Sequence, residues 1–203
     1  MSVITISRQF GAGGKTLGEM VAKKMNYSFV DNEIIQMVAQ KAKVSTQWVE
    51  FIEKEAGGKL LKFMAGLVPR SVVERVLDEK EGYIDEEVFI DLLNEIVAEI
   101  ADEGNVVILG RGGQYILRDR KDVFHVLAIA HLNDRILFME KQYRLSTAQA
   151  TQAVHREDKR RSSLYRKLGR KDYDHPDLYH VVLNMSKVKL EKACDLICDL
   201  IKQ

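Results

Sequence analysis

The first 25 residues constrain the fold more than any other part of the chain. Residues 3–7 form a β-branched run with the composition of a buried strand. A glycine-rich turn follows, and from about Lys15 to Met25 apolar residues recur at helical spacing. A strand, a glycine-rich turn and a helix in this order form an anion-binding site, because N–H groups of the turn and of the helix N-terminus point toward the bound group.

The residues of this turn predict that the anion is a phosphate. Glycine is required where a phosphate approaches the main chain closely and where a residue takes a positive φ. In the Walker A pattern GxxxxGK[ST], Lys15 and Thr16 fit, whereas Gln9 stands in place of the first glycine. In a gapless alignment to small kinases that read GxxGxGKG[ST], two glycines of the turn fit and Gly14 takes the lysine position. Both alignments stay open, and a tight turn that only packs the helix on the strand is the structural alternative.

Four more short apolar runs predict strands, at residues 28–30, 105–110, 123–129 and 180–183. Helical spacing dominates most of the remaining chain. Strands with little polar alternation, separated by helices, indicate an α/β fold with a five-stranded parallel sheet flanked by helices. Ligands bind such sheets at the carboxyl ends of the strands, which is where Asp31 and Arg111 stand.

Two stretches depart from the nearly balanced charge of the chain, whose formal net charge is +1 over 203 residues. Residues 74–103 hold 12 acidic and 2 basic side chains, which fits either a partner surface or a solvated helix face. Residues 155–171 hold 8 basic and 2 acidic side chains. Because two acidic residues cannot neutralise eight basic ones, this basic stretch favours an anionic partner over a merely solvated helix.

The order of these features resembles the cytidylate kinase-like proteins, a branch of the nucleoside monophosphate kinases within the P-loop NTPases. The opening ITISRQFGAGG, residues 4–14, carries the most specific part of the resemblance. The segments YSFVD at 27–31, VVILGRGG at 106–113 and HREDKRR at 155–161 resemble the family's second strand, its third strand with an arginine turn, and its arginine-rich lid. The resemblance covers nearly the whole chain.

This resemblance implies a single P-loop kinase domain over residues 1–203, with a helical insertion at 36–99 that binds the acceptor and an arginine-rich lid at 141–172. It implies transfer of the γ-phosphoryl group of ATP, with Mg²⁺, to a small-molecule acceptor, a nucleoside monophosphate. Phosphoryl transfer depends mostly on positioning and on neutralising charge, and arginine matches phosphate oxygens bidentately. The residues expected to bind ATP are Gly11, Ala12, Gly13, Gly14, Lys15 and Thr16, with Thr16 beside the metal; Asp31 and Arg111 are expected to bind the acceptor; Lys15, Arg111, Arg156, Arg160 and Arg161 are expected to act on the reacting phosphates.

Two of these positions have further interpretations. Cytidylate kinases follow the equivalent arginine with an aspartate that reads the cytosine amino group, whereas Arg111 is followed by Gly112 and Gly113. This position therefore predicts no particular base. Asp31 is also a candidate N-cap for the helix expected to begin at Glu33.

Three other functions fit parts of the sequence. A kinase of another small metabolite fits the same fold, since fold does not fix function. A nucleotide-binding regulatory module without turnover fits the displaced lysine and the missing aspartate. Binding of nucleic acid through residues 155–171 is disfavoured, because a single aromatic residue, Tyr165, interrupts a stretch where stacking platforms need several.

Composition excludes other classes of protein. With 46% hydrophobic and 30% charged residues, the chain has the composition of a folded globular domain. No apolar run approaches the roughly 20 residues of a membrane span. Cys194 and Cys198 stand four residues apart among apolar neighbours, which indicates buried hydrophobic side chains rather than a disulfide or a metal site. The absence of a signal sequence and of a disulfide pattern predicts a cytoplasmic protein.

Overall fold

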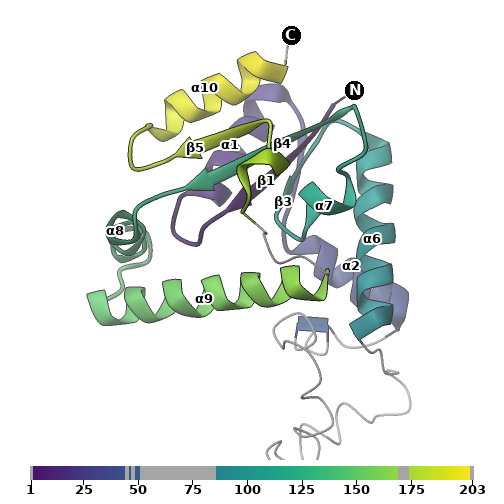
Figure 1. The fold of residues 1–203 in the computed structure, drawn as a ribbon, viewed down its shortest axis with the longest axis horizontal. Helices are drawn as coiled ribbons and strands as arrows, with labels where there is room; N and C mark the ends of the chain where they lie inside the picture. The colour runs from purple at the N-terminus through teal and green to yellow at the C-terminus, as the bar shows by residue number, and fades with distance from the viewer. Residues whose placement is uncertain (1, 44–45, 47–48, 51–85, 169–173, 202–203) are drawn as a thin grey trace, which may run out of the picture.

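The computed structural model describes residues 2–43, 46, 49–50, 86–168 and 174–201. Its strands form one parallel sheet in the order β2-β3-β1-β4-β5, so the predicted five-stranded α/β fold is confirmed. The strands are β1 (Val3–Arg8), β2 (Ser28–Val30), β3 (Val106–Leu109), β4 (Val123–Ile129) and β5 (Val181–Asn184). Because all neighbouring pairs are parallel, the carboxyl ends of the strands meet at one edge of the sheet (Figure 1).

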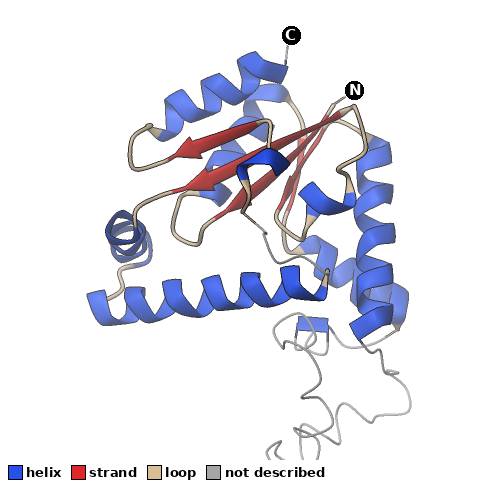
Figure 2. Cartoon of the chain, viewed as in Figure 1, coloured by secondary structure: helices blue, strands red, loops and turns tan. Residues whose placement is uncertain are grey.

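Helices cover both faces of the sheet (Figure 2). They are α1 (Gly14–Met25), α2 (Glu33–Ala42), α6 (Glu86–Glu103), α7 (Gly113–Ile116), α8 (Leu132–Tyr143), α9 (Thr147–Lys167) and α10 (Leu190–Ile201), with a short 3₁₀ helix at Pro176–Leu178. The predicted helical insertion at 36–99 is helical at both ends, where α2 packs against α6. Its part from 51 to 85 lies outside the described residues.

Alternate residues of β1 divide the core into two halves, as the period of a strand requires. Ile4 and Ile6 pack on one face against α1 and α10, and this half of the core includes the buried side chains of Cys194 and Cys198. Both cysteines are buried and they are not joined by a disulfide, so the prediction of two buried hydrophobic side chains is confirmed. On the other face Val3 packs with residues of α2 and α6.

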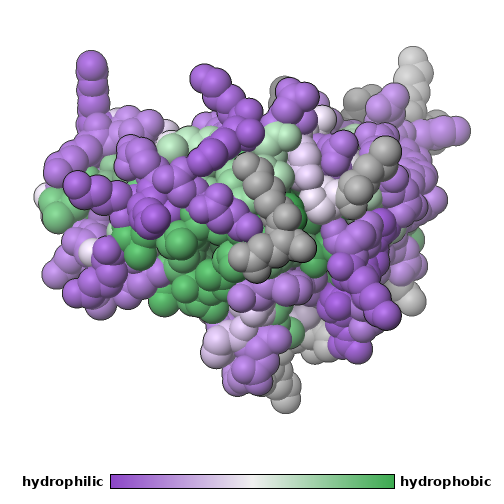
Figure 3. Space-filling model, turned by 90° about the horizontal axis from the view of Figure 1, so that it is seen from above, coloured by the Kyte–Doolittle hydropathy of each residue, from purple (hydrophilic) through white to green (hydrophobic). Residues whose placement is uncertain are grey.

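Viewed from above, most of the molecular face carries hydrophilic side chains, with a hydrophobic area near its centre (Figure 3). Among the larger apolar side chains, Val182 of the edge strand β5 and Leu200 of α10 are exposed. None of the described helices combines the length and the apolar character needed to cross a bilayer.

The long helix α9 occupies most of the predicted lid at 141–172. It begins in a capping box, in which the side chain of Ser146 accepts from the N–H of Gln149 and the Gln149 side chain accepts from the N–H of Ser146. Residues 169–173, which include the end of the predicted lid, lie outside the described residues. The capping box ends the chain's turn at Ser146 and starts the helix, and α9 then runs beside the carboxyl edge of the sheet (Figure 1).

Candidate functional site

A cavity of about 500 Å³ lies at the carboxyl ends of β1, β2 and β3. Its walls are the glycine-rich loop and first turn of α1, the turns after β2 and β3, and the facing sides of α8 and α9. The charged side chains that line it are Arg8, Lys15, Arg111, Arg160 and Arg161, with Glu19, Asp31 and Glu157. Cationic groups outnumber carboxylates in this lining, so the cavity favours an anionic ligand.

The glycine-rich loop takes the conformation expected of an anion site. Gly11 has a φ of 82° and Gly13 a φ of 77°, in the region that favours glycine. Gly13 is the N-cap of α1, and the helix begins at Gly14. The first-turn N–H groups, those of Gly14, Lys15 and Thr16 among them, have no carbonyl partner within the helix and provide donors at this end of the cavity.

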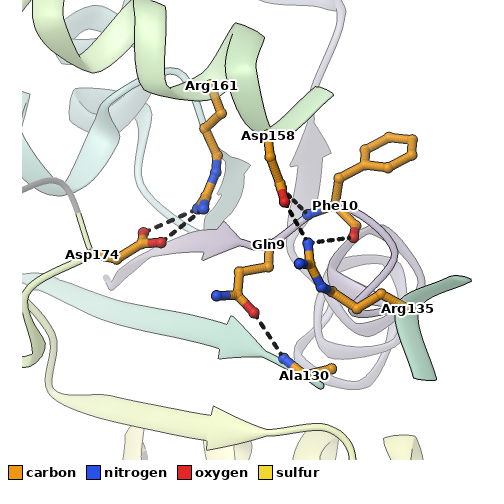
Figure 4. A network of polar contacts seen from close by, with 7 residues as sticks. All are labelled: Gln9, Phe10, Ala130, Arg135, Asp158, Arg161 and Asp174. Atoms are coloured by element: carbon orange, nitrogen blue, oxygen red, sulfur yellow. Dashed lines mark hydrogen bonds and ion pairs between the residues drawn. The ribbon is translucent and has the colours of Figure 1, made fainter. Parts of the chain in front are cut away.

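A polar network holds this loop against α8 and α9 (Figure 4). The Nη1 group of Arg135 donates to the Phe10 carbonyl oxygen at 3.2 Å and to Asp158 at 2.8 Å. Asp158 also accepts from the Phe10 N–H at 3.4 Å. The side chain of Gln9, the residue that departs from the Walker pattern, accepts from the N–H of Ala130 at 3.1 Å. Gln9 therefore ties the loop to the end of β4.

Ala12 does not line the cavity, although the sequence assigned it to the phosphate site. It is buried, and its N–H donates to the carbonyl of Gln9 at 3.1 Å. The other five residues expected to bind ATP phosphates, Gly11, Gly13, Gly14, Lys15 and Thr16, all line the cavity. The two alignments place the lysine position of the motif at residue 14 or at residue 15, and both of these residues line the cavity.

The turn after β3 holds Arg111 in a strained conformation. Gly110, Arg111 and Gly112 have φ values of 74°, 56° and 74°, and of these three only the arginine carries a Cβ. A residue of this kind in the left-handed region costs about 1 kcal/mol and is found where a side chain must be aimed. The Nη2 group of Arg111 donates to the side-chain oxygen of Asn32 at 3.1 Å.

The electrostatics of Arg111 point to an anion in this cavity. Burial, together with the nearby charges of Arg160 and Arg8, lowers the pKa of Arg111 to about 10, against the opposing effect of Asp31. The group is still cationic at neutral pH. Gathering these guanidinium groups in one place costs free energy, and a bound phosphate offsets that cost.

Arg8 is a site residue that the sequence arguments did not assign. It ends β1, its side chain is 29% exposed, and its Nη2 lies 3.9 Å from the Asp31 carboxylate. Burial lowers the pKa of Arg8 below its ordinary value, while Asp31 opposes this shift. Its position directly at the carboxyl end of the first strand was the available signal.

Asp31 lies in the cavity lining, close to Arg8, as a site role requires. Its alternative as a helix cap is wrong, because the N-cap of α2 is Asn32. The backbone N–H of Asp31 instead donates to the side chain of Glu33 at 2.9 Å. The Asp31 carboxylate is therefore available to the cavity rather than committed to the helix end.

The three predicted lid arginines are placed differently. Arg160 and Arg161 line the cavity, whereas Arg156 does not; its side chain is 72% exposed and contacts Glu157. Arg161 donates two hydrogen bonds to Asp174, at 3.0 and 2.7 Å (Figure 4). Nη1 of Arg160 lies 3.3 Å from the carboxylate of Glu157. A carboxylate therefore orients each of these two cavity arginines.

Other residues that the sequence did not assign also line the cavity, among them Asn32, Glu157 and Tyr165. Tyr165 is the aromatic residue that interrupts the basic stretch, and it is buried against Tyr115 with an edge-to-face ring contact of 5.6 Å. Tyr165 interrupts the basic stretch because its side chain packs in the protein interior, where a charged side chain would be unfavourable. Asn32 follows Asp31 at the carboxyl end of β2, which was the available signal, whereas Glu157 has no local signal because it reaches the site only through the packing of α9.

The donor set fits nucleotide phosphates. Loop N–H groups and the N-terminus of α1 lie across one cavity from the guanidinium of Arg111. The Thr16 hydroxyl lines the same end of the cavity and suits a magnesium ion carried by phosphates. Among the described residues, no three His, Cys, Asp or Glu side chains gather as ligands for a metal held by protein alone.

Solved structures share this fold at low sequence identity. An uncharacterised protein from Eubacterium ventriosum ATCC 27560 has a TM-score of 0.68 and 18% identity, covering 100% of this chain and 99% of that one. A sugar kinase from Janibacter sp. HTCC2649 has a TM-score of 0.51 and 14% identity, covering 100% and 95%. Shikimate kinase from Acinetobacter baumannii, in complex with shikimate, has a TM-score of 0.50 and 14% identity, covering 100% and 93%. These likenesses establish the fold.

Comparison with curated proteins gives no match. The model of the cytidylate kinase-like family, in contrast, matches residues 3–187, from the start of β1 to just beyond β5. That range contains the glycine-rich loop, the Arg111 turn and all of α9. With this match and a five-stranded parallel sheet shared with P-loop kinases, the chain belongs to the cytidylate kinase-like family.

Proposed function

We propose that the protein is a phosphotransferase that moves the γ-phosphoryl group of ATP to the phosphate of a nucleoside monophosphate. The observation that carries this proposal is that one cavity joins the glycine-rich loop to the Arg111 turn and the arginines of α9. A site for nucleotide binding alone has no need of a second cationic wall facing the first. Two anionic groups that must react have that need.

The loop side of the cavity is proposed to hold ATP. The N–H groups at the start of α1 would bind the phosphates, and Lys15 and Thr16 extend from the same turn. Magnesium, held through Thr16, supplies charge neutralisation on the transferred group. The glycines of the loop let the phosphates approach the main chain.

The Arg111 side is proposed to hold the acceptor phosphate. Arg111, oriented by Asn32, matches two phosphate oxygens at once, and Asp31 orients the rest of the acceptor. An acceptor phosphate oxygen forms the new bond to the γ-phosphorus as the bond to the β,γ-bridging oxygen breaks, which leaves ADP and a nucleoside diphosphate. An acceptor phosphate in its dianionic form, with a second pKa near about 6, has no proton to remove.

The lid at 141–172 is proposed to complete the site. Arg160 and Arg161 face the cavity already, and movement of α9 would bring Arg156 toward it. Closure would exclude water, whose attack on ATP is the competing side reaction. The carboxylates that hold Arg160 and Arg161 keep their guanidinium planes in place during closure.

The test is ADP formation from ATP and magnesium with a panel of CMP, UMP, AMP and GMP as acceptors. We expect acceptor-dependent ADP formation. Turnover with a pyrimidine nucleotide would mean that residues other than the one after Arg111 read the base, and turnover with purines alone would keep the kinase but not a cytidylate substrate. ATP binding without turnover of any acceptor would contradict the proposal and favour a regulatory module or a different small metabolite.

Variants of α1 check that the loop side is the ATP side. Lys15→Ala should weaken phosphoryl transfer, since Lys15 lines the cavity. Lys23→Ala is the matched control, because Lys23 is an exposed lysine of the same helix outside the cavity. Equal activities of the two variants would remove Lys15 from the proposed site.

A further inference from the structure

We infer that Arg8, rather than Lys15, supplies the principal phosphate-contacting cation of the glycine-rich loop. The inference rests on the proposed function, in which this loop holds the phosphates of ATP. In Walker-type loops one lysine at the start of the helix reaches the outer phosphates. This chain has glycine at the first helical position and lysine at the second.

The space in front of Gly14 is filled by Arg8. A Cβ added to Gly14 would lie 2.6 Å from Cβ and 2.7 Å from Cγ of Arg8, closer than real side chains approach. The stem of Arg8 therefore occupies the place where a side chain at position 14 would begin. Glycine at 14 and arginine at 8 are complementary, because a lysine at 14 and this arginine exclude each other.

The guanidinium of Arg8 then extends toward the acceptor side. A Cβ added to Gly110 would fall 2.1 Å from its Nη1, so the head group lies against the start of the Arg111 turn. Arg8 thus spans the cavity from the start of α1 to the end of β3. This is the interval in which a transferred phosphoryl group must sit between donor and acceptor.

The bonding of Arg8 leaves it suited to phosphate. Its ion pair with Asp31 measures 3.9 Å, longer than a hydrogen bond, so this pair orients the guanidinium without using its N–H donors. The charges of Arg161 and Arg160 also act on it. A bidentate phosphate contact would offset the repulsion among these arginines.

Lys15 lines the same cavity from a more exposed position. It follows Gly14 by one helical position, about 100° around the axis, and its side chain is exposed. Its charge contributes to the lowered pKa of Glu33, after the larger effects of the backbone N–H groups of Asp31 and Glu33. The charge of Lys15 therefore acts partly on the start of α2, and we expect this exposed side chain to assist at the rim of the cavity that it lines.

Two replacements of Arg8 test this assignment. Arg8→Gln keeps the stem above Gly14 and removes the charge. The double variant Arg8→Gly with Gly14→Lys moves the cation back to the helix start, and is compared with each single change. Arg118→Gln is the matched control, since Arg118 is exposed, contacts Asp119 and does not line the cavity. Each variant is measured for kcat and, by calorimetry, for affinity toward Mg·ATP.

We expect Arg8→Gln and Arg8→Gly to lower kcat about 100-fold or more, Lys15→Ala to lower it less, and Arg118→Gln to leave it unchanged. The double variant should recover activity to within about tenfold of the parent chain, whereas Gly14→Lys alone is as damaged as the Arg8 variants. Activity of Arg8→Gln within about threefold of the parent would overturn the inference. So would a larger loss in Lys15→Ala, or a folded double variant no better than Arg8→Gly.

Circular dichroism and thermal melting establish that each variant folds. If the double variant does not fold, the activity of Arg8→Gln alone tests the inference. Failure of the proposed function is recognised separately. If the parent protein binds Mg·ATP without phosphorylating any acceptor, the affinities decide: weaker binding by Arg8→Gln than by Lys15→Ala supports the inference, and equal binding overturns it. A parent protein that does not bind Mg·ATP overturns both.

Discussion

Nη1 of Arg135 lies 2.8 Å from the carboxylate of Asp158, an ion pair that joins α8 to α9 beside the glycine-rich loop. Both partners also bind the main chain of Phe10, the arginine its carbonyl oxygen and the aspartate its N–H. The shape of the loop therefore depends on where α9 lies. This coupling makes α9 part of the ATP side of the proposed site as well as its cover.

Replacing Asp158 should weaken both the fold and ATP binding. Asp158→Ala leaves the buried guanidinium of Arg135 without its carboxylate, which we expect to cost about 2 kcal/mol of unfolding free energy because Asp158 is itself partly exposed. The KM for ATP should rise, since Phe10 loses a contact. Urea unfolding and steady-state kinetics check this, with Asp119→Ala, an exposed ion-pair aspartate, as control. Unchanged stability would mean that the pair does not hold the loop.

His125 should make the fold sensitive to mild acid. It pairs across the sheet with Thr5, whose Oγ1 lies 2.6 Å from its Nδ1, and it is 4% exposed. Burial, together with the nearby His180, lowers the pKa of His125 from 6.5 to about 4. The unfolded chain therefore takes up the proton first, so this contribution to stability is complete above pH 6.5 and is lost as the pH falls toward 4.

Urea unfolding at pH 7 and pH 5 measures this loss. The parent protein should lose about 2 kcal/mol more than His125→Gln between these values, because the variant has no imidazole at that position. Carboxylates, most of which are still ionised at about pH 5, contribute equally to both proteins and cancel in the comparison. Parallel pH profiles of the two proteins would show that His125 does not carry the dependence.

Arg111→Gly should raise the stability of the protein and lower its activity. Glycine removes the strain of a φ of 56° and the repulsion from Arg8 and Arg160, so the unfolding free energy should rise by about 1 kcal/mol. The kcat/KM for the acceptor should fall about 100-fold, because the proposed phosphate contact is gone. Asn26→Gly, also at a φ of 56° but at the end of α1, is the control for backbone relief. A fully active Arg111→Gly protein would exclude Arg111 from the acceptor site.

Gly110→Ala should abolish turnover because it displaces the side chain of Arg8. The added methyl group would fall 2.1 Å from Nη1 of Arg8 and push the guanidinium aside. Gly104→Ala is the matched control, because Gly104 has a φ of 69°, close to the 74° of Gly110, and lies at the end of α6 outside the cavity. Both variants should lose about 1 kcal/mol of stability, and only Gly110→Ala should lose phosphoryl transfer. Equal activity of the two would contradict this position for Arg8.

Much of the site was predictable because its signals are local. The glycine-rich loop was predictable because its residues are adjacent in the sequence. The positive φ values of Gly11 and Gly13 and the helix start at Gly14 follow from the glycines themselves. Arg111 was predictable because it lies in the turn just after the buried strand β3 of a parallel sheet. Arg156 shows the limit of such reasoning. Arg156 and Arg160 are one helical turn apart and share a face of α9, yet only Arg160 and its neighbour Arg161 reach the cavity, because the packing of α9 decides which turns of the helix lie beside it.

The sequence by itself determined the five-stranded parallel sheet, the glycine-rich loop and the burial of the two cysteines. Apolar runs, glycines and helical spacing are signals carried by a few neighbouring residues, so they can be recognised without the fold. Only the tertiary structure decided that Arg8 covers Gly14, that Arg135 meets Asp158, and that Thr5 bonds His125 across 120 residues of chain. These contacts join segments that are distant in sequence. Their geometry is set by how strands register and helices pack, which no local pattern encodes.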